Sequence, residues 1–326
     1  MKPPVFVVGC PRSGTSLLYH LLLSAGGFAE FRTQMNVFDV LEPIYGDLGV
    51  PKNKNAAIRE WLGSKAFKVS GLDPEEIKSK LVAECANAGD FLRIVMDEIA
   101  RKQGLDRWID STPTNIPHML RIGRDFPQAQ FIHIIRDGRD VALSLDKLGW
   151  SRPLPWQRKK GLLAAGLYWK WIVQKGMRYG HELGNRYLEV RYEDLVIAPQ
   201  KQLVRIGRFL GCHLDYERIQ KTSVGSVKNP LTSFKDELLT GHFTPVGRWK
   251  EQIPPAQLAL FEGLVGDWLV ALGYELRNVE PKSSKAMAVK EMQVLYALFY
   301  PFKQWAKVNT PLSKWMVNYS AILIDK

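Results

Sequence analysis

Cysteine is scarce in this chain, and its scarcity excludes two common ways of stabilising a fold. The 326 residues include three cysteines, Cys10, Cys85 and Cys212, which lie far apart and form no Cys-x-x-Cys pair. A disulfide framework and a structural zinc site are therefore not expected. This cysteine usage is typical of a protein from a reducing compartment.

Long apolar runs are also missing. Charged residues interrupt every long apolar stretch, so the sequence predicts no transmembrane span. The apolar run Val5–Val8 is too short for a signal peptide and has no cleavage site of small residues after it. We therefore expect a cytoplasmic enzyme.

Acidic residues are too few to balance the basic ones, and the net charge is +12. Such a surface favours anionic partners, including nucleotide phosphates, acidic acceptors, nucleic acid and acidic membranes. No nucleic-acid recognition motif accompanies the charge, so nucleic acid is not an expected partner.

The order of the expected elements predicts the fold class. Short runs rich in β-branched and aromatic residues predict strands over Val5–Val8, Trp108–Asp110, Gln130–Ile135 and Arg186–Val190. Helical patterns cover Thr15–Ser24, Ile116–Arg124, Gly161–Lys175 and Pro199–Leu210, while Pro43, Pro51 and Pro74 predict loops and short helices between Thr33 and Leu92. This alternation predicts a three-layer α/β/α fold around a mostly parallel sheet.

A glycine turn follows the first predicted strand. Gly9 and Gly14 have the spacing of a phosphate-binding loop, whose backbone N–H groups and following helix N-terminus bind anions. A nucleoside-triphosphate P-loop has lysine after the second glycine, whereas this chain has Thr15 there and a cation at Arg12. An ordinary ATPase or kinase is disfavoured, and a phosphoryl-transfer enzyme on this scaffold remains an alternative.

Four segments together resemble one enzyme family. Pro11–Leu18 resembles the 5′-phosphosulfate-binding loop of sulfotransferases that use 3′-phosphoadenosine 5′-phosphosulfate (PAPS). Phe131–Ser144 is similar to the family's 3′-phosphate motif, in which an arginine ends a strand and a serine follows eight residues later. Val190–Leu195 and Pro245–Trp249 resemble further segments of the family, the latter in the protein-tyrosine sulfotransferase branch.

The resemblance implies a P-loop-like sulfotransferase domain over residues 1–280, which moves a sulfuryl group from PAPS to a hydroxyl or amine acceptor without a bound metal. It implies that PAPS is held by Arg12, Ser13, Gly14, Thr15, Ser16, Arg136, Ser144, Tyr192, Gly247 and Arg248. Arg12 is also an expected catalytic residue, because its charge would offset negative charge that develops on the sulfuryl group.

The catalytic base is harder to predict. Gln34 stands at our best match to the glutamate of the heparan-type branch, and glutamine cannot accept a proton at neutral pH. Glu30 is the nearest carboxylate and is our predicted base, with the alternatives Asp39, Glu42 and His118 left open.

A second departure concerns the transferring sulfate. Ser111 occupies the place where relatives often have a lysine that touches this group. The two departures leave a catalytically silent nucleotide-binding protein as a further alternative.

The acceptor and the C-terminal tail are the least specified parts. The acceptor is a small molecule, a lipid, a glycan or a peptide, and Trp156 is predicted to lie in a lid over it. Residues 281–326 combine lysines with aromatic residues, as surface-lying amphipathic helices do, and Pro301 and Pro311 are predicted to break them into pieces. Packing on the domain, packing in a homo-oligomer and contact with a membrane surface all remain open for this tail.

Overall fold

A four-stranded parallel sheet organises the molecule. The computed structural model describes residues 1–149, 161–222, 224, 245–277 and 283–310, so the predicted lid residue Trp156 lies outside the described residues. The sheet has the order β2-β1-β3-β4, formed by Val5–Gly9 (β1), Ile109–Asp110 (β2), Gln130–Ile135 (β3) and Tyr187–Arg191 (β4). All pairs are parallel, and Val5 of β1 lies opposite both Ile109 and Gln130.

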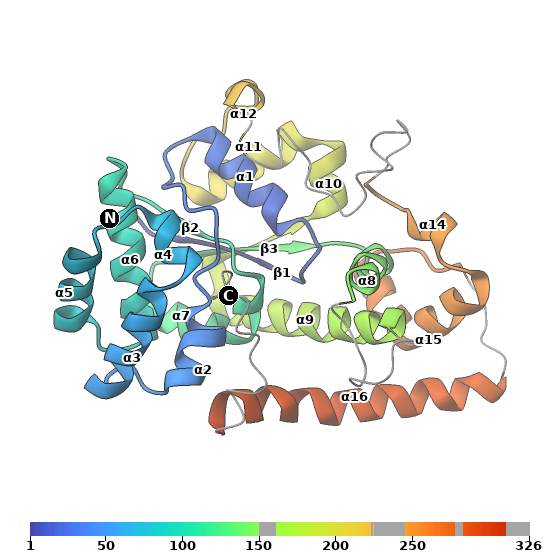
Figure 1. Ribbon diagram of the computed structural model, residues 1–326. Coiled ribbons are helices and arrows are strands. Elements are labelled where there is room, and N and C mark those ends of the chain that lie inside the picture. Colours follow the sequence, from blue (N-terminus) through green and yellow to red (C-terminus); the bar gives the residue numbers. More distant parts are fainter. Residues whose placement is uncertain (150–160, 223, 225–244, 278–282, 311–326) are drawn as a thin grey trace.

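Helices cover both faces of this sheet (Figure 1). Val5 and Val7 pack into a core with helices α1 (Thr15–Ala25), α10 (Tyr192–Ile197), α11 (Pro199–Leu210) and α12 (Tyr216–Thr222). Phe6 and Val8 point to the other side, where the core includes helices α6 (Ala88–Lys102), α7 (Met119–Asp125) and α9 (Gly161–Leu183). Alternate residues of a strand face opposite ways, so each face of β1 needs its own helical layer. The predicted three-layer α/β/α fold is confirmed.

The predicted elements differ from the observed ones mainly around prolines. The region from Thr33 to Leu92 contains not only short helices but also α3 (Pro51–Leu62) and α5 (Pro74–Glu84), and α6 begins within it at Ala88. Pro51 and Pro74 begin their helices, because the first helical position needs neither the missing N–H nor a free φ angle. Loops and short helices are present as predicted, but Pro51 and Pro74 begin helices that are longer than expected.

The remaining elements complete the fold. They are η1 (Val37–Leu41), α2 (Glu42–Tyr45), α4 (Lys65–Ser70), η2 (Pro113–His118), α8 (Gly138–Lys147), η3 (Gly184–Arg186), α14 (Trp249–Gln252) and α15 (Pro255–Ala271). The helix predicted over Ile116–Arg124 divides in two, since Pro117 lies in the 3₁₀ segment η2 and α7 begins only at Met119.

The C-terminal segment forms one long helix, α16 (Ser283–Asn309), which runs along the outside of the molecule (Figure 1). Pro301 lies inside it, so the predicted break at that residue was wrong; Pro311 lies outside the described residues. Tyr300 of α16 contacts Trp171 of α9 with ring centroids 4.7 Å apart. Contacts of this kind hold the helix against the body despite the backbone N–H that proline lacks.

No helix in the described part of the chain is both long and apolar enough to cross a membrane.

Candidate active site

The turn between β1 and α1 requires both of its glycines. A Cβ atom on Gly9 would lie 2.6 Å from the carbonyl oxygen of Ile134, closer than real Cβ contacts allow. Gly14 has φ 98°, and a Cβ there would lie 2.3 Å from Cδ2 of Tyr192. The glycines therefore let the loop pack against β3 and against the Tyr192 ring.

This loop presents hydrogen-bond donors at the start of α1. The first N–H groups of a helix have no partner within the helix, and Gly14 supplies no side-chain cap. Thr15 and Ser16 form the first turn of α1. Ser13 is fully buried, and its Oγ has no hydrogen-bond partner in the described part of the chain. An oxyanion at this helix end would satisfy these groups.

Two arginines meet beside the loop. Arg12 Nε donates to Ser144 Oγ at 2.8 Å, and Arg136 Nη1 donates to the carbonyl oxygen of Arg12 at 3.0 Å. The guanidinium of Arg136 lies over the Tyr192 ring, 4.4 Å from its centroid. The structure thus brings Arg12, Arg136, Ser144 and Tyr192 together from three separate segments.

The positive charges of Arg12 and Arg136 favour the binding of an anion beside the loop. Burial and the nearby charge of Arg136 lower the pKa of Arg12 below its usual value. Nε of Arg136 is buried and, among the described residues, has no hydrogen-bond partner. A bound anion would relieve the repulsion between the two cations and accept the remaining hydrogen bonds.

The segment Pro245–Trp249 also packs beside Arg136. Arg136 Nη2 donates to the carbonyl oxygen of Pro245 at 2.6 Å, and the backbone N–H groups of Gly247 and Trp249 donate to the Asp140 carboxylate at 2.8 and 3.0 Å. Arg248 lies between these two residues and is buried, with 6% of its surface exposed. Asp140, which the sequence analysis did not single out, therefore places Gly247 and Arg248 beside the arginine pair.

A buried network braces these segments from behind. Arg139 is 2% exposed, donates to Asp137 and Glu262, and lies 3.6 Å from the ring centroid of Trp249. The Glu193 carboxylate accepts from the backbone N–H of Asp137 at 2.9 Å and from Tyr274 Oη at 3.0 Å. Burial raises the pKa of Glu193, although these donors oppose the change. The dense charges of residues 136–140 and 190–194, each following a predicted strand, were the available signal for this network.

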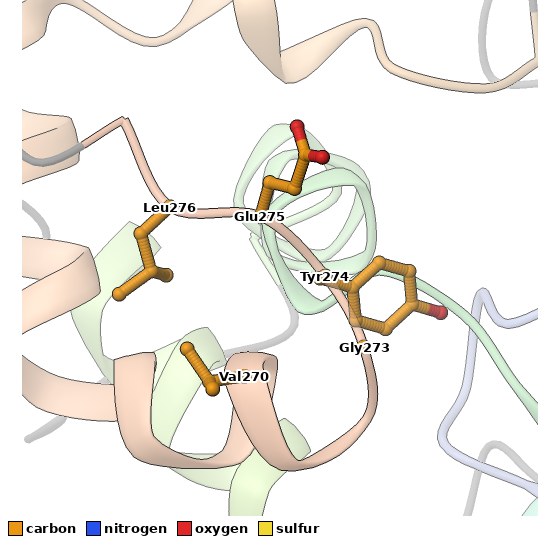
Figure 2. A pocket seen from close by; sticks show the side chains of 5 residues that line it. All are labelled: Val270, Gly273, Tyr274, Glu275 and Leu276. Atoms are coloured by element: carbon orange, nitrogen blue, oxygen red, sulfur yellow. The ribbon is translucent and has the colours of Figure 1, made fainter.

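A surface hollow lies next to this network (Figure 2). It has a volume of about 580 Å³ and is lined by Val270, Gly273, Tyr274, Glu275 and Leu276. Glu275 is its charged residue, and the Glu275 carbonyl oxygen accepts from Arg139 at 2.8 Å. The lining lacks the basic groups that the loop end has, so we assign no ligand to the hollow.

Glu30, the predicted base, is not brought to this site. Its neighbour Ala29 pairs with Trp108, just before β2 begins, and both backbone groups of Glu30 bond the side chain of Gln103 at the end of α6. The arginine pair lies at the opposite, carboxyl edge of the sheet. The Glu30 carboxylate itself is exposed and pairs with Arg32. This placement argues against Glu30 as the base.

Glu42 is also engaged elsewhere. Its carboxylate accepts hydrogen bonds from both terminal nitrogens of Arg121, one of them at 2.7 Å. This hydrogen bonding raises the pKa of Arg121. Glu42 therefore anchors α2 to α7.

Asp39 and His118 lie side by side. His118 Nε2 is 3.8 Å from Asp39 Oδ1, and Lys307 Nζ of α16 donates to the same oxygen at 2.7 Å. Burial alone would raise the pKa of Asp39, but His118 and Lys307 together hold it below its usual value. An aspartate held in this way is a weak base.

This pair borders a buried region that reaches the loop. Burial raises the pKa of Tyr168 well above its usual value, and the nearby Tyr300, Cys10 and Asp39 raise it further. Cys10 follows β1 directly and is fully buried. Asp39, Tyr168 and Tyr300 thus lie near Cys10, which leads into the phosphate loop, and we call the region of Asp39, His118, Tyr168, Tyr300 and Lys307 the tyrosine end of the site.

Two positions, Gln34 and Ser111, depart from the family pattern described above. Gln34 is exposed, and Ser111 is half-buried between β2 and η2. Next to Ser111, the carboxylate of Asp110 accepts from Thr112 N at 3.0 Å and from Asn115 Nδ2 at 2.7 Å. Within the described ranges, no three His, Cys, Asp or Glu side chains are grouped so that they could hold a metal ion.

Comparison with known proteins gives a family and a fold. A sequence model described as the sulfotransferase family matches residues 3–216. An uncharacterized protein of Aquifex aeolicus (strain VF5) is 27% identical over 233 residues, which is 66% of this chain and 26% of that protein. The match thus spans about a quarter of this relative's length.

Two solved structures share the architecture. The sulfotransferase domain of the olefin synthase of Synechococcus PCC 7002 aligns with a TM-score of 0.58 and 22% identity, over 84% of this chain and 96% of that domain. A sulfotransferase domain from the curacin biosynthetic pathway aligns with a TM-score of 0.57 and 19% identity, over 85% and 99% of the two chains.

Proposed function

Because this chain belongs to the sulfotransferase family, we propose that it transfers the sulfuryl group of PAPS to a hydroxyl or amine acceptor. The observation that carries the proposal is the meeting of Arg12, Arg136 and Ser144 at the phosphate loop. PAPS has phosphate at both its 5′ and 3′ positions, and two cations at one helix N-terminus suit such a bisphosphorylated ligand.

We propose that two groups of residues, here called cradles, each bind one phosphate-bearing end of this ligand. Gly14, Thr15 and Ser16 hold the 5′-phosphosulfate with their N–H groups, and Ser13 contributes its unsatisfied hydroxyl. Arg136 and Ser144 hold the 3′-phosphate, as the family motif implies, and the Tyr192 ring supports Arg136. Gly247 and Arg248 close the cradle from the C-terminal side.

In the proposed reaction, the acceptor oxygen or nitrogen attacks sulfur from the side opposite the 5′-phosphate. The bond between sulfur and the bridging oxygen breaks, and its electron pair leaves with adenosine 3′,5′-bisphosphate. Arg12 offsets the negative charge that builds on the bridging oxygen. Positioning and fixed charge supply the rate enhancement, as in phosphoryl transfer.

The acceptor proton goes to His118 in this proposal. Of the four candidate bases, Glu30 is remote, Glu42 is bound to Arg121, and Asp39 is held by Lys307. Asp39 acts as a positioning residue, since its carboxylate lies beside the imidazole and stabilises the imidazolium that forms.

Transfer of labelled sulfate from PAPS into an extract, followed by mass identification of the product, tests the reaction. We expect Arg12→Ala and Arg136→Ala each to lower transfer by about 100-fold or more, since each removes a charged donor from the reacting ligand. Arg205→Ala is the matched control, because Arg205 is remote and binds one backbone oxygen at 2.8 Å. Undiminished transfer in both site variants, or magnesium-dependent ATP turnover without sulfate transfer, would reject the proposal.

The base is tested separately. We expect His118→Gln to lower kcat by about 100-fold or more and to leave the affinity for adenosine bisphosphate unchanged. Glu30→Gln should retain full activity, and a large loss in that variant alone would return the base to Glu30.

A further inference from the structure

The outward face of α16 carries a strip of large apolar side chains. Its exposed members are Val294, Leu295, Leu298, Phe299, Phe302 and Trp305. Val294, Leu298, Phe302 and Trp305 follow each other at spacings of four, four and three residues, which places them on one side of a helix. Each is at least half exposed, from 50% for Phe299 to 70% for Leu298. Contiguous exposed apolar surface of this kind marks an interaction site.

The opposite face of the same helix is already occupied. Tyr296 stacks on Tyr300 at 4.9 Å, and Tyr300 contacts Tyr168 of α9. Gln293 Nε2 donates to the carbonyl oxygen of Leu264 in α15 at 2.7 Å, and Lys307 binds Asp39. The inward face therefore fixes α16 on the body, so the strip is not an undocked core face.

The strip can meet a flat surface along its whole length. Because α16 is one rod on the outer side of the molecule (Figure 1), its outward side chains are accessible together. From Val294 to Trp305 the strip extends about 16 Å. The rings of Phe302 and Trp305 lie nearly parallel, with centroids 6.0 Å apart. Aromatic rings beside lysines are typical of helices that lie in a lipid headgroup region.

The basic character of the chain decides between possible occupants. The whole chain has net charge +12, the sequence of residues 282–326 contains seven lysines and two acidic residues, and the exposed Lys303 directly follows Phe302 in α16. Two copies meeting through this strip would bring like charges together, which disfavours self-association. An acidic lipid surface instead attracts juxtaposed lysines. We propose that the strip on α16 docks the protein on an acidic lipid surface.

Docking would set the distance between the bilayer and the tyrosine end. The inward face of α16 contacts Asp39 through Lys307, so one helix diameter, about 10 Å, separates this end from the lipid. The proposal stands independently of sulfuryl transfer, because it rests on the strip and its charge alone.

Sedimentation of the full chain with vesicles tests the docking. We expect the protein to pellet with vesicles of phosphatidylcholine and phosphatidylserine, to pellet at least about tenfold less with phosphatidylcholine alone, and to be released partly by salt. Leu298→Glu and Phe302→Glu should each reduce binding at least about tenfold, since each places a carboxylate in the acidic headgroup region.

A matched control separates this effect from added charge alone. Ile197 of α10 is 75% exposed and lies on the opposite side of the sheet from α16, so Ile197→Glu should bind vesicles like the wild type. Thermal melting confirms that each variant is folded. Equal pelleting of wild type and both strip variants overturns the proposal. A dimer by light scattering that Leu298→Glu dissociates, without vesicle binding by the wild type, assigns the strip to a second copy and also overturns it.

Discussion

The phosphate-loop end and the tyrosine end of this site are built in different ways. At the loop end, Arg12, Arg136 and Asp140 lie on or directly after segments that leave the carboxyl edge of the sheet, and buried ion pairs brace them. At the tyrosine end, η1, η2, α9 and α16 each contribute one or two side chains, and Lys307 is tied to Asp39 across 268 residues of sequence. The first end is a fixed cradle, and the second depends on how distant helices are docked.

The difference suits the proposed function, in which the loop end holds the donor and the tyrosine end receives the acceptor. A cradle that must fit one invariant ligand gains from rigid bracing, because preorganised donors need no rearrangement during reaction. An acceptor region assembled from separate helices can change one helix at a time without disturbing the cradle. We therefore expect substitutions at the loop end to cost more stability than substitutions at the tyrosine end.

The largest effect is expected for the brace at the loop end. Arg139→Ala leaves Asp137 and Glu262 buried without their cation, which should lower the free energy of unfolding by about 3–5 kcal/mol. Urea denaturation measures this change. Arg178 forms an exposed ion pair with Glu182 in one turn of α9, so Arg178→Ala should cost less than about 1 kcal/mol. Similar costs for both variants would mean that the loop end is not braced as described.

The next effect concerns the turn itself. Gly14→Ala forces a side chain into the left-handed region and against Tyr192, and it should cost about 1–3 kcal/mol in stability and abolish bisphosphate binding. Gly104 also has positive φ but has no atom within 4 Å of the added Cβ. Gly104→Ala therefore measures the backbone cost alone, about 1–2 kcal/mol. Normal nucleotide affinity in Gly14→Ala would contradict the tight packing of the loop.

The tyrosine end should show a smaller effect. A double-mutant cycle of Asp39→Asn and Lys307→Met should give a coupling energy of about 0.5–3 kcal/mol, since the pair is largely buried and shares one hydrogen bond. Bisphosphate affinity should stay unchanged in each variant, as the two ends are separate. A coupling near zero would show that Lys307 does not hold α16 in place.

The last effect is a pH dependence of stability. Burial raises the pKa of Asp110 to about 6, although Thr112 and Asn115 donate to its carboxylate. The folded state therefore holds this proton more tightly than the unfolded chain does. The resulting stabilisation is complete below the unfolded value of about 3.9 and is lost as pH rises through about 6. Asp110→Asn should remove this dependence, and unfolding free energies measured at about pH 4 and pH 8 should show the difference. Parallel pH profiles of the two proteins would contradict it.

Much of the fold and of the loop end could be predicted from the sequence because local signals mark them. The strand over Gln130–Ile135 has the observed bounds, and the helix beginning at Thr15 follows a glycine turn whose spacing is itself informative. Arg136 and Ser144 belong to one continuous segment, so their proximity needs no knowledge of tertiary structure.

The tyrosine end lacked such signals. The proximity of Asp39, His118 and Lys307 depends on the docking of three elements, and no spacing in the chain encodes it. Glu30 was chosen for its closeness in sequence to Gln34, but its backbone bonds to Gln103 hold it near the amino edge of the sheet. Pro301 was expected to end a helix, and packing of the neighbouring tyrosines on α9 overrides that local preference.

The most direct test of the central claim is calorimetry with adenosine 3′,5′-bisphosphate in the absence of magnesium. The two-cradle site predicts saturable one-to-one binding that Arg136→Ala abolishes and Arg205→Ala leaves intact. Binding of ATP with magnesium, together with no heat from the bisphosphate, would contradict the assignment of both cradles.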